Sequence, residues 1–283
     1  MKVHAIQTGT VRIKTAQVQA KRNPPGSLID VFTDRNWTDW VPTFAWAIES
    51  DDGVIVVDTG QAAYLLDEVT HSPHPFIRLA ASFRIAPEEE IGMQLKGLGI
   101  GQRDVRQVVL THMHIDHDAG LSHFPQSEIL AAPGEIARSK GVAGMLLGYL
   151  PQRWPAWFDP QGLVLDDGPY GPFAASKRLT RDGRVVAVAT PGHTPEHLSV
   201  IVEEDGQVLF LAGDTSYTQQ LMLDGKVDGV TQDPAVARRT HAAIRQFASE
   251  RPTVYLPAHD PESGARFRER RTVVVPARVK GAA

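Results

Sequence analysis

Short apolar segments separated by glycine, proline and acidic turn residues dominate the hydrophobic pattern of this 283-residue chain. Brief runs rich in valine, isoleucine and leucine have the length of β-strands and are too short for independent helices. A turn such as Ser50-Asp51-Asp52-Gly53 between two of these runs indicates a hairpin. The pattern predicts short strands within 3–20, and further strands at 44–49, 53–57, 108–110, 127–132, 184–189, 198–202, 208–212 and 253–257.

Three proline-led segments predict helices, and they begin at Pro87, Pro133 and Pro234. The first has acidic residues in its opening turn, at the positive end of the helix dipole. Ile91, Leu95 and Leu98 would form its buried stripe, and Gly99 would end it. Strands and helices thus come in two successive sets, without a linker or low-complexity tract between them.

One connection, 21–41, is predicted to be a loop because it begins with Asn23-Pro24-Pro25-Gly26. It also carries more apolar side chains than a solvated loop usually has, including Trp37 and Trp40. These side chains either pack on a sheet or line a pocket. They suit a dimer contact equally well, so a homodimer is a hypothesis that a sedimentation mass equal to one chain would exclude.

Two other connections are irregular. Residues 61–83 are predicted to form a surface loop or broken helix, in which His71 and His74 are exposed and do not bind metal. Residues 141–160 are rich in aromatic residues, broken by prolines and without helical periodicity. We interpret this second segment as a lid over a pocket, with a buried edge as the alternative.

Composition and charge narrow the class of protein. A net charge of −4 and a pI near 6.3 provide no basic surface for a nucleic-acid backbone. The basic cluster 266–271 is interpreted as the solvated face of a C-terminal helix. Without cysteine there are no disulfides and no thiolate ligands. Neither a signal peptide nor about 20 consecutive apolar residues is visible, so we expect a cytoplasmic protein with no membrane partner and no nucleic-acid partner.

Candidate chemistry is concentrated in one stretch, Thr111–Gly120, directly after a buried apolar strand. His112 and His114 are two positions apart on extended backbone, so their side chains point to the same side and can share one ion. Asp116 and His117, on the turn that follows, can reach a second ion. Histidine and carboxylate donors without sulfur suit Zn²⁺ first, with Fe²⁺, Mn²⁺ or Co²⁺ as alternatives.

Further candidate donors lie where other predicted strands end, at Asp58, His193, Asp214 and His259. Strand ends that meet at one edge of a sheet gather residues distant in sequence into one site. Asp58 is a candidate for holding a metal-bearing loop in place from outside the ligand set, and capping of a turn is the alternative.

The motif His112-x-His114-x-Asp116-His117, followed in order by His193, Asp214 and His259, resembles the metallo-β-lactamase superfamily. The strand end Asp58-Thr59-Gly60 matches that superfamily as well. The resemblance covers nearly the whole chain. It implies an α/β (α+β) fold, a four-layer αβ/βα sandwich in which residues 1–283 form a single domain of two similar halves.

The same resemblance implies how seven ligands divide between two divalent metal ions. One ion would be held by His112, His114 and His193, and the other by Asp116, His117 and His259. Asp214 would bridge both ions, and Asp58 would brace the loop.

Within the superfamily, Asp-Thr-Ser-Tyr-Thr at 214–218 is similar to the N-acyl homoserine lactone lactonases, whose tyrosine three residues after the bridging aspartate lies over the metals. Tyr217 falls in that place. The Gly192–His197 turn also resembles this branch. Two departures are Glu196, where the branch usually has glycine, and Asp118, where it usually has a small residue.

By this resemblance the reaction is hydrolytic opening of the lactone ring of an N-acyl homoserine lactone. Two neighbouring metals would lower the pKa of a bridging water to give hydroxide, and one would polarise the carbonyl. Asp116, primarily a ligand, can also orient the water or accept its proton. Tyr217 would donate a hydrogen bond to the carbonyl or leaving oxygen, unless its hydroxyl only closes a loop. Several aromatic side chains are candidates to line an acyl-chain trough, although core or edge packing is the favoured interpretation of each: Trp37, Trp40, Phe76, Phe83, Trp154, Trp157 and Phe158.

Competing functions of this fold separate on sequence features. A cysteine-liganded β-lactamase is excluded by the absence of cysteine. A glyoxalase-type thioesterase is expected to have a helical domain after His259, and a nuclease or flavin-linked reductase would have additional domains. The remaining alternatives are a lactonase or esterase for another small ester and a non-catalytic metal-binding relative. His123 and His197 are expected to be structural, because the seven-ligand set is complete without them.

Overall fold

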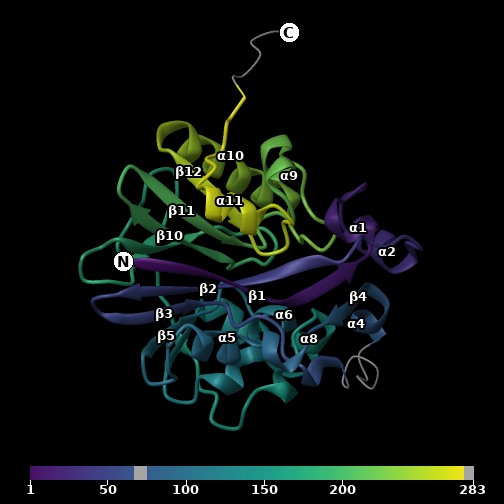
Figure 1. Ribbon diagram of the computed structural model, residues 1–283. Helices are drawn as coiled ribbons and strands as arrows, with labels where there is room; N and C mark the ends of the chain where they lie inside the picture. The colour runs from purple at the N-terminus through teal and green to yellow at the C-terminus, as the bar shows by residue number, and fades with distance from the viewer. Residues whose placement is uncertain (67–74, 277–283) are drawn as a thin grey trace.

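The computed structural model describes residues 1–66 and 75–276. Two β-sheets pack face to face and helices cover the outer face of each, which gives four layers (Figure 1). The predicted exposure of His71 and His74 concerns positions outside the described residues. Within the described ranges, no helix is both long enough and apolar enough to cross a membrane.

The first sheet has the strand order β4-β1-β2-β3-β5-β6-β7. β3, β5, β6 and β7 run parallel to one another, so their carboxyl ends lie at one edge. The strands span Lys2–Ile13 (β1), Val41–Ser50 (β2), Gly53–Val57 (β3), Ala81–Arg84 (β4), Val105–Val109 (β5), Glu128–Ala131 (β6) and Gln161–Gly162 (β7).

The second sheet has the order β12-β11-β10-β9-β8. β10 is antiparallel to both β9 and β11, and β12 is parallel to β11, so β9, β11 and β12 all end at the same edge. The strands span Ser176–Arg178 (β8), Val185–Ala189 (β9), Leu198–Glu204 (β10), Gln207–Gly213 (β11) and Thr253–Pro257 (β12).

Alternation along the strands builds the central and outer cores. In β11, Leu209 and Leu211 face the first sheet, whereas Val208 and Phe210 face the helix layer and pack with Ile244 of α10 (Pro234–Glu250). Both faces of the strand are therefore buried, which is why it reads as a continuous apolar run. Apart from the segment 3–20, the predicted strands are confirmed, as are the hairpin at 44–57 and the helix that begins at Pro234.

The other helices are short. They span Thr15–Val18 (α1), Gly26–Thr33 (α2), Pro75–Ala80 (α4), Ile91–Gly97 (α5), Ile115–Asp118 (α6), Pro133–Arg138 (α7), Gly141–Leu146 (α8), Gln219–Asp224 (α9) and Ser263–Glu269 (α11), with 3-10 turns at Pro87–Glu89, Ala119–His123 and Pro151–Arg153.

The strand prediction for residues 3–20 is correct only as far as Ile13. Asp34 lies beside the following residues, and its Oδ2 accepts hydrogen bonds from the Thr15 hydroxyl (2.7 Å) and the Ala16 N–H (2.8 Å). This distant carboxylate satisfies donors at the start of α1 and ends the extended conformation.

The loop prediction for 21–41 is wrong over α2. Val31 is fully buried against Ala16 and Ala80, so the helix has a core-facing side. An ion pair between Arg22 and Asp30 links the residues before the helix to its middle. The contacts that stabilise this helix thus come largely from outside it, which local composition does not reveal.

Basic side chains cover the two tryptophans of this segment. The Lys14 ammonium lies 3.8 Å from the centroid of the Trp37 ring, and the Arg84 guanidinium 3.9 Å from that of Trp40. Both contacts are cation–π interactions that occupy the indole faces. The homodimer stays a prediction.

The helix predicted from Pro87 is divided in two. Glu90 has extended backbone between the 3-10 turn and α5, and Leu98 is 47% exposed, so its predicted place in the buried stripe is wrong. Gly99 follows with φ 81°, a left-handed conformation that ends the helix as predicted.

The solvated interpretation of 266–271 is also wrong at its first residue. Arg266 is buried and donates to the Tyr255 carbonyl (2.9 Å) and to Asp260 Oδ2 (3.0 Å). A buried guanidinium needs such partners, and these tie α11 to β12.

The central core gives a stability prediction. Leu256 is fully buried between the sheets, so Leu256→Ala should lower the free energy of unfolding by about 2–5 kcal/mol. Leu98→Ala, at an exposed position, should cost less than about 1 kcal/mol. Urea denaturation of both variants measures the difference, and equal losses would contradict the placement of the core.

Candidate metal centre

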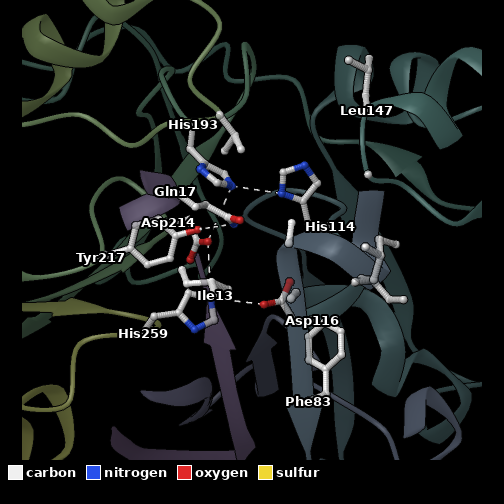
Figure 2. A pocket seen from close by; sticks show the side chains of 16 residues that line it. Ile13, Gln17, Phe83, His114, Asp116, Leu147, His193, Asp214, Tyr217 and His259 are labelled. Carbon is white, nitrogen blue, oxygen red and sulfur yellow. Dashed lines mark hydrogen bonds and ion pairs between the residues drawn. The ribbon is translucent and has the colours of Figure 1, made fainter. Parts of the chain in front are cut away.

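The predicted metal-binding side chains meet at the edge where the strands of both sheets end. Figure 2 shows those that line the pocket, namely His114, Asp116, His193, Asp214 and His259. The turn after β5 and the short helix α6 supply the first group, and the turns after β9, β11 and β12 supply the rest. The residues brought together are His112, His114, Asp116, His117, His193, Asp214 and His259.

Three imidazoles form one part of the cluster. Donor atoms of His112, His114 and His193 lie within 4.8 Å of one another. Nδ1 of His114 and Nε2 of His193 are only 3.0 Å apart. Two ring nitrogens at this distance share either a proton or a cation between them.

Asp214 lies at the centre. Its carboxylate oxygens are 3.3 Å from His117 Nε2, 3.6 Å from His193 Nε2 and 3.4 Å from His259 Nε2. Asp116 completes the other side, with Oδ2 3.4 Å from His259 Nε2. One carboxylate therefore touches histidines of both predicted ligand groups.

Unpaired polar atoms test whether this cluster fits metal ions. Nε2 of His112 is buried and has no hydrogen-bond partner in the described part of the chain. Nε2 of His117 and Oδ1 of Asp214 are also buried; they face each other at 3.3 Å and neither makes a hydrogen bond within the described residues. Buried polar atoms are normally paired, and here the three converge. Nitrogen and oxygen donors without sulfur suit Zn²⁺ and related divalent ions, so the residues fit such ions.

Burial and neighbouring charge divide the histidines into two kinds. Burial lowers the pKa of His112 well below its usual value and that of His114 to about 3, so both rings are neutral. Burial also opposes charge on His259, but Asp214 and Asp116 together outweigh it and raise the pKa of His259 to about 10. His117 has its pKa raised in the same way by Asp214 and Asp58. Protons thus balance the buried carboxylates when no cation is bound.

Asp58 braces the ligand loop from behind. It follows β3 in a left-handed conformation (φ 58°), and its carboxylate accepts hydrogen bonds from the Thr111 N–H (2.7 Å) and hydroxyl (2.9 Å). Its Oδ2 is also 2.9 Å from His117 Nδ1. This contact fixes the ring so that Nε2 faces Asp214. Asp58 thus lies where a carboxylate that braces the loop is expected.

Asp228 plays a similar part for His193 and was missed by the sequence analysis. Its Oδ2 lies 3.2 Å from His193 Nδ1, while the backbone N–H groups of Val230 and Thr231 donate to its other oxygen. The Thr231 hydroxyl donates to Oδ2 as well. Asp228 follows no strand, and the run Asp-Gly-Val-Thr, which suits a side-chain-capped turn, was the only local signal.

His197 and His123 lie outside the candidate metal groups, as expected. The Asp214 N–H donates to His197 Nε2 (3.1 Å), so Nδ1 carries the proton and donates to the Thr190 hydroxyl (3.0 Å). His197 thus supports the turn that carries Asp214. His123 pairs with Glu90 (2.6 Å).

Asp118 and Glu196, the two departures from the lactonase pattern, both accept hydrogen bonds from the segment between β6 and β7. Trp154 Nε1 donates to Asp118 Oδ2 (2.7 Å), and the Gly134 N–H donates to Glu196 Oε2 (2.7 Å). Burial raises the pKa of Asp118 to about 8. Both carboxyl groups connect turns of the metal centre to the segment between β6 and β7.

A pocket with apolar walls opens beside the cluster (Figure 2). The space between its walls, with the open mouth included, is about 630 Å³. Leu147 and Gly148, from the segment predicted to be a lid, line one side. The remaining lining residues are Ile13, Gln17, Ile77, Ala80, Ala81, Phe83, His114, Ile115, Asp116, His193, Asp214, Tyr217, Val230 and His259.

Among the aromatic candidates for the acyl-chain trough, Phe83 lines this pocket. Trp154 and Phe158 pack against a core cluster, and Trp157 is exposed away from the lining. Trp37 and Trp40 are likewise not part of it. The side chain of Phe76 is outside the described part of the structure. Trp154 and Phe158 therefore belong to packing, the interpretation favoured from the sequence, whereas Phe83 lines the pocket.

The sequence profile of the metallo-beta-lactamase superfamily matches residues 38–259, and the chain belongs to this superfamily. The superfamily fold implies bound divalent metal ions, for which the clustered histidines and aspartates are candidate ligands. The match spans the turns that carry every candidate ligand. It confirms the family and fold predicted from the motifs.

The chain is also similar to individual members of this class of protein. A probable metallo-hydrolase of Mycobacterium tuberculosis is 32% identical over 195 residues, which are 68% of this chain but only 60% of that protein's length. An N-acyl homoserine lactonase of Rhizobium radiobacter is 22% identical over 95% of this chain and 97% of its own. A solved N-acyl homoserine lactone hydrolase, with N-hexanoyl-L-homoserine at its catalytic metal center, superposes with TM-score 0.75, at 20% identity and 98% coverage of both chains.

The contact between Asp58 and His117 predicts a change in metal affinity. Asp58→Asn keeps the shape but removes the charge, and should weaken zinc binding by about 10- to 100-fold. Asp51→Asn, on an exposed turn, is the matched control. Competition with a chromophoric chelator measures both. Unchanged affinity in Asp58→Asn would show that the brace does not influence the ligands.

Proposed function

We propose that this protein is a metal-dependent hydrolase that opens the lactone ring of N-acyl homoserine lactones. The observation that carries the proposal is the convergence of seven histidine and aspartate donors beside an apolar pocket. Similarity to N-acyl homoserine lactonases along 95% of the chain supports the substrate class.

The spacing of the donor atoms supports the ligand assignment that the family resemblance implies. His112, His114 and His193 would hold one divalent ion, Asp116, His117 and His259 the other, and Asp214 would bridge them. Zinc is the proposed metal, with iron, cobalt or manganese as alternatives. When bound, the ions would supply Lewis-acid activation of the substrate carbonyl and of a water nucleophile.

Asp116 and Tyr217 are the proposed reaction residues of the chain. Burial opposes ionisation of Asp116, but His259 and His117 together outweigh it and lower the pKa of Asp116 to about 2. The ionised carboxylate can accept or orient a proton at the pocket. Burial and Asp214 raise the pKa of Tyr217 well above its usual value. The phenol therefore keeps its proton, and its role is to donate a hydrogen bond to developing charge on the substrate oxygen.

The position of Tyr217 also supports its proposed role as a hydrogen-bond donor to the substrate. Its ring stacks on His259, with centroids 5.6 Å apart, and lies 6.4 Å from His193. These contacts place the tyrosine between the two predicted ligand groups. A loop-closing role alone would not require it to line the pocket.

The substrate class is tested by acid release at constant pH, using zinc- or cobalt-loaded protein and short- and long-chain N-acyl homoserine lactones. We expect turnover in the wild type and its loss in Asp214→Ala, because that variant lacks the shared ligand. Stoichiometric metal binding without turnover would overturn the substrate class. Other small lactones and esters would then be tested, and a non-catalytic role would hold only if none reacts.

A separate prediction concerns the phenol. Tyr217→Phe should lower kcat on the same lactones by about 10²-fold, the usual effect of removing one donor from a developing oxyanion. Metal content, measured by atomic absorption, should not change, since Tyr217 is not in the ligand set. A kcat within twofold of the wild type would exclude the hydrogen-bonding role.

A further inference from the structure

The short helix α1 brings a polar side chain into the pocket from the N-terminal part of the chain. The Ala20 N–H donates to the Val227 carbonyl, and the Gly229 N–H donates to the Gln17 carbonyl, both at 2.8 Å. A Cβ on Gly229 would lie 2.2 Å from the Ala16 carbonyl oxygen, so this close approach requires glycine. The backbone of Gln17 is therefore fixed against the loop that carries Asp228.

The side chain of Gln17 contacts Tyr217. Its Nε2 donates to the Tyr217 hydroxyl oxygen at 3.0 Å, and Figure 2 shows the carboxamide reaching into the pocket beside Tyr217 and Asp214. Because the amide nitrogen can only donate, the phenol accepts this bond and its own proton is free to point elsewhere. Gln17 thus orients the donor that the reaction uses.

The other end of the carboxamide has no partner. Oε1 of Gln17 is buried and accepts no hydrogen bond from any described residue, although the side chain lines the pocket. A buried acceptor left unpaired is unfavourable, so a ligand N–H that reaches it would remove this penalty. The absence of a partner for Oε1 is a matter of hydrogen bonding alone and does not depend on the charges of the metal-binding cluster.

We propose that Gln17 is a specificity-determining residue whose Oε1 accepts the amide N–H of the substrate, an inference that rests on the proposed function. In an N-acyl homoserine lactone the amide nitrogen is bonded to the ring carbon next to the lactone carbonyl. A substrate whose carbonyl oxygen meets Tyr217 therefore presents its N–H close to the side chain that orients Tyr217. One glutamine would contact both the reacting end and the acylamino branch.

The test compares two lactones that differ in one atom pair: an N-acyl homoserine lactone, and the α-acyloxy-γ-butyrolactone of the same chain length, in which oxygen replaces N–H. The wild-type metal-loaded enzyme should prefer the amide by about tenfold in kcat/KM, the range of one hydrogen bond that satisfies a buried acceptor. Gln17→Met keeps the length and the packing, and should reduce that preference to about twofold or less. Gln19→Met, at an exposed position of the same segment, is the matched control and should keep the wild-type preference.

Binding of the ring-opened products gives a second readout without turnover. Calorimetry should show that the wild type binds the N-acyl homoserine about tenfold more tightly than its acyloxy counterpart, and that Gln17→Met loses the difference. If Gln17→Met slows both lactones equally and keeps the ratio, Gln17 only positions Tyr217 and the assignment is overturned. If the wild type opens neither lactone, the proposed function fails instead, so the two failures are distinguishable.

Discussion

The site depends on one buried carboxylate with three imidazoles around it. Asp214 contacts His117, His193 and His259, and the pKa of each of these rings is raised despite burial, because aspartates lie next to them. Like charges buried this closely would be costly without a counter-charge at their centre. Divalent cations can take the place of the protons, since they supply the same positive charge to the same carboxylates.

Outer contacts determine which nitrogen of each ring faces the centre. Asp58 holds His117 and Asp228 holds His193, while Nδ1 of His259 lies 3.0 Å from the Pro42 carbonyl. Asp58 and Asp228 come from two different loops, and Pro42 belongs to strand β2. The ring orientations therefore follow from the packing of both sheets. A substitution that alters this packing would reorient the histidines even if the substituted residue does not contact them.

The sequence predicted those features that depend on residues close together in the chain, and missed those that depend on contacts between distant residues. His112 to His117 are close in the chain, and Asp214 and His259 follow strong apolar strands, so local pattern and a family motif were enough to identify them. Asp228 and Gln17 have no such pattern, because their partners are distant in sequence. The same reason explains the missed helices α1 and α2 and the buried Arg266, whose stabilising contacts are made in the folded chain. Propensity alone does not resolve such cases.

The contact between α1 and the loop at 227–229 has a consequence for how the protein matures. Gln17 and His259 come from opposite ends of the chain, and both line the same pocket. During synthesis, α1 emerges long before the loop at 227–229 that it contacts. The complete constellation thus forms only after the last strand has joined the sheet, and such non-local closure is intrinsically slow. Metal uptake at full affinity should therefore report that the whole chain has folded, and an incomplete chain would leave its histidines without a site.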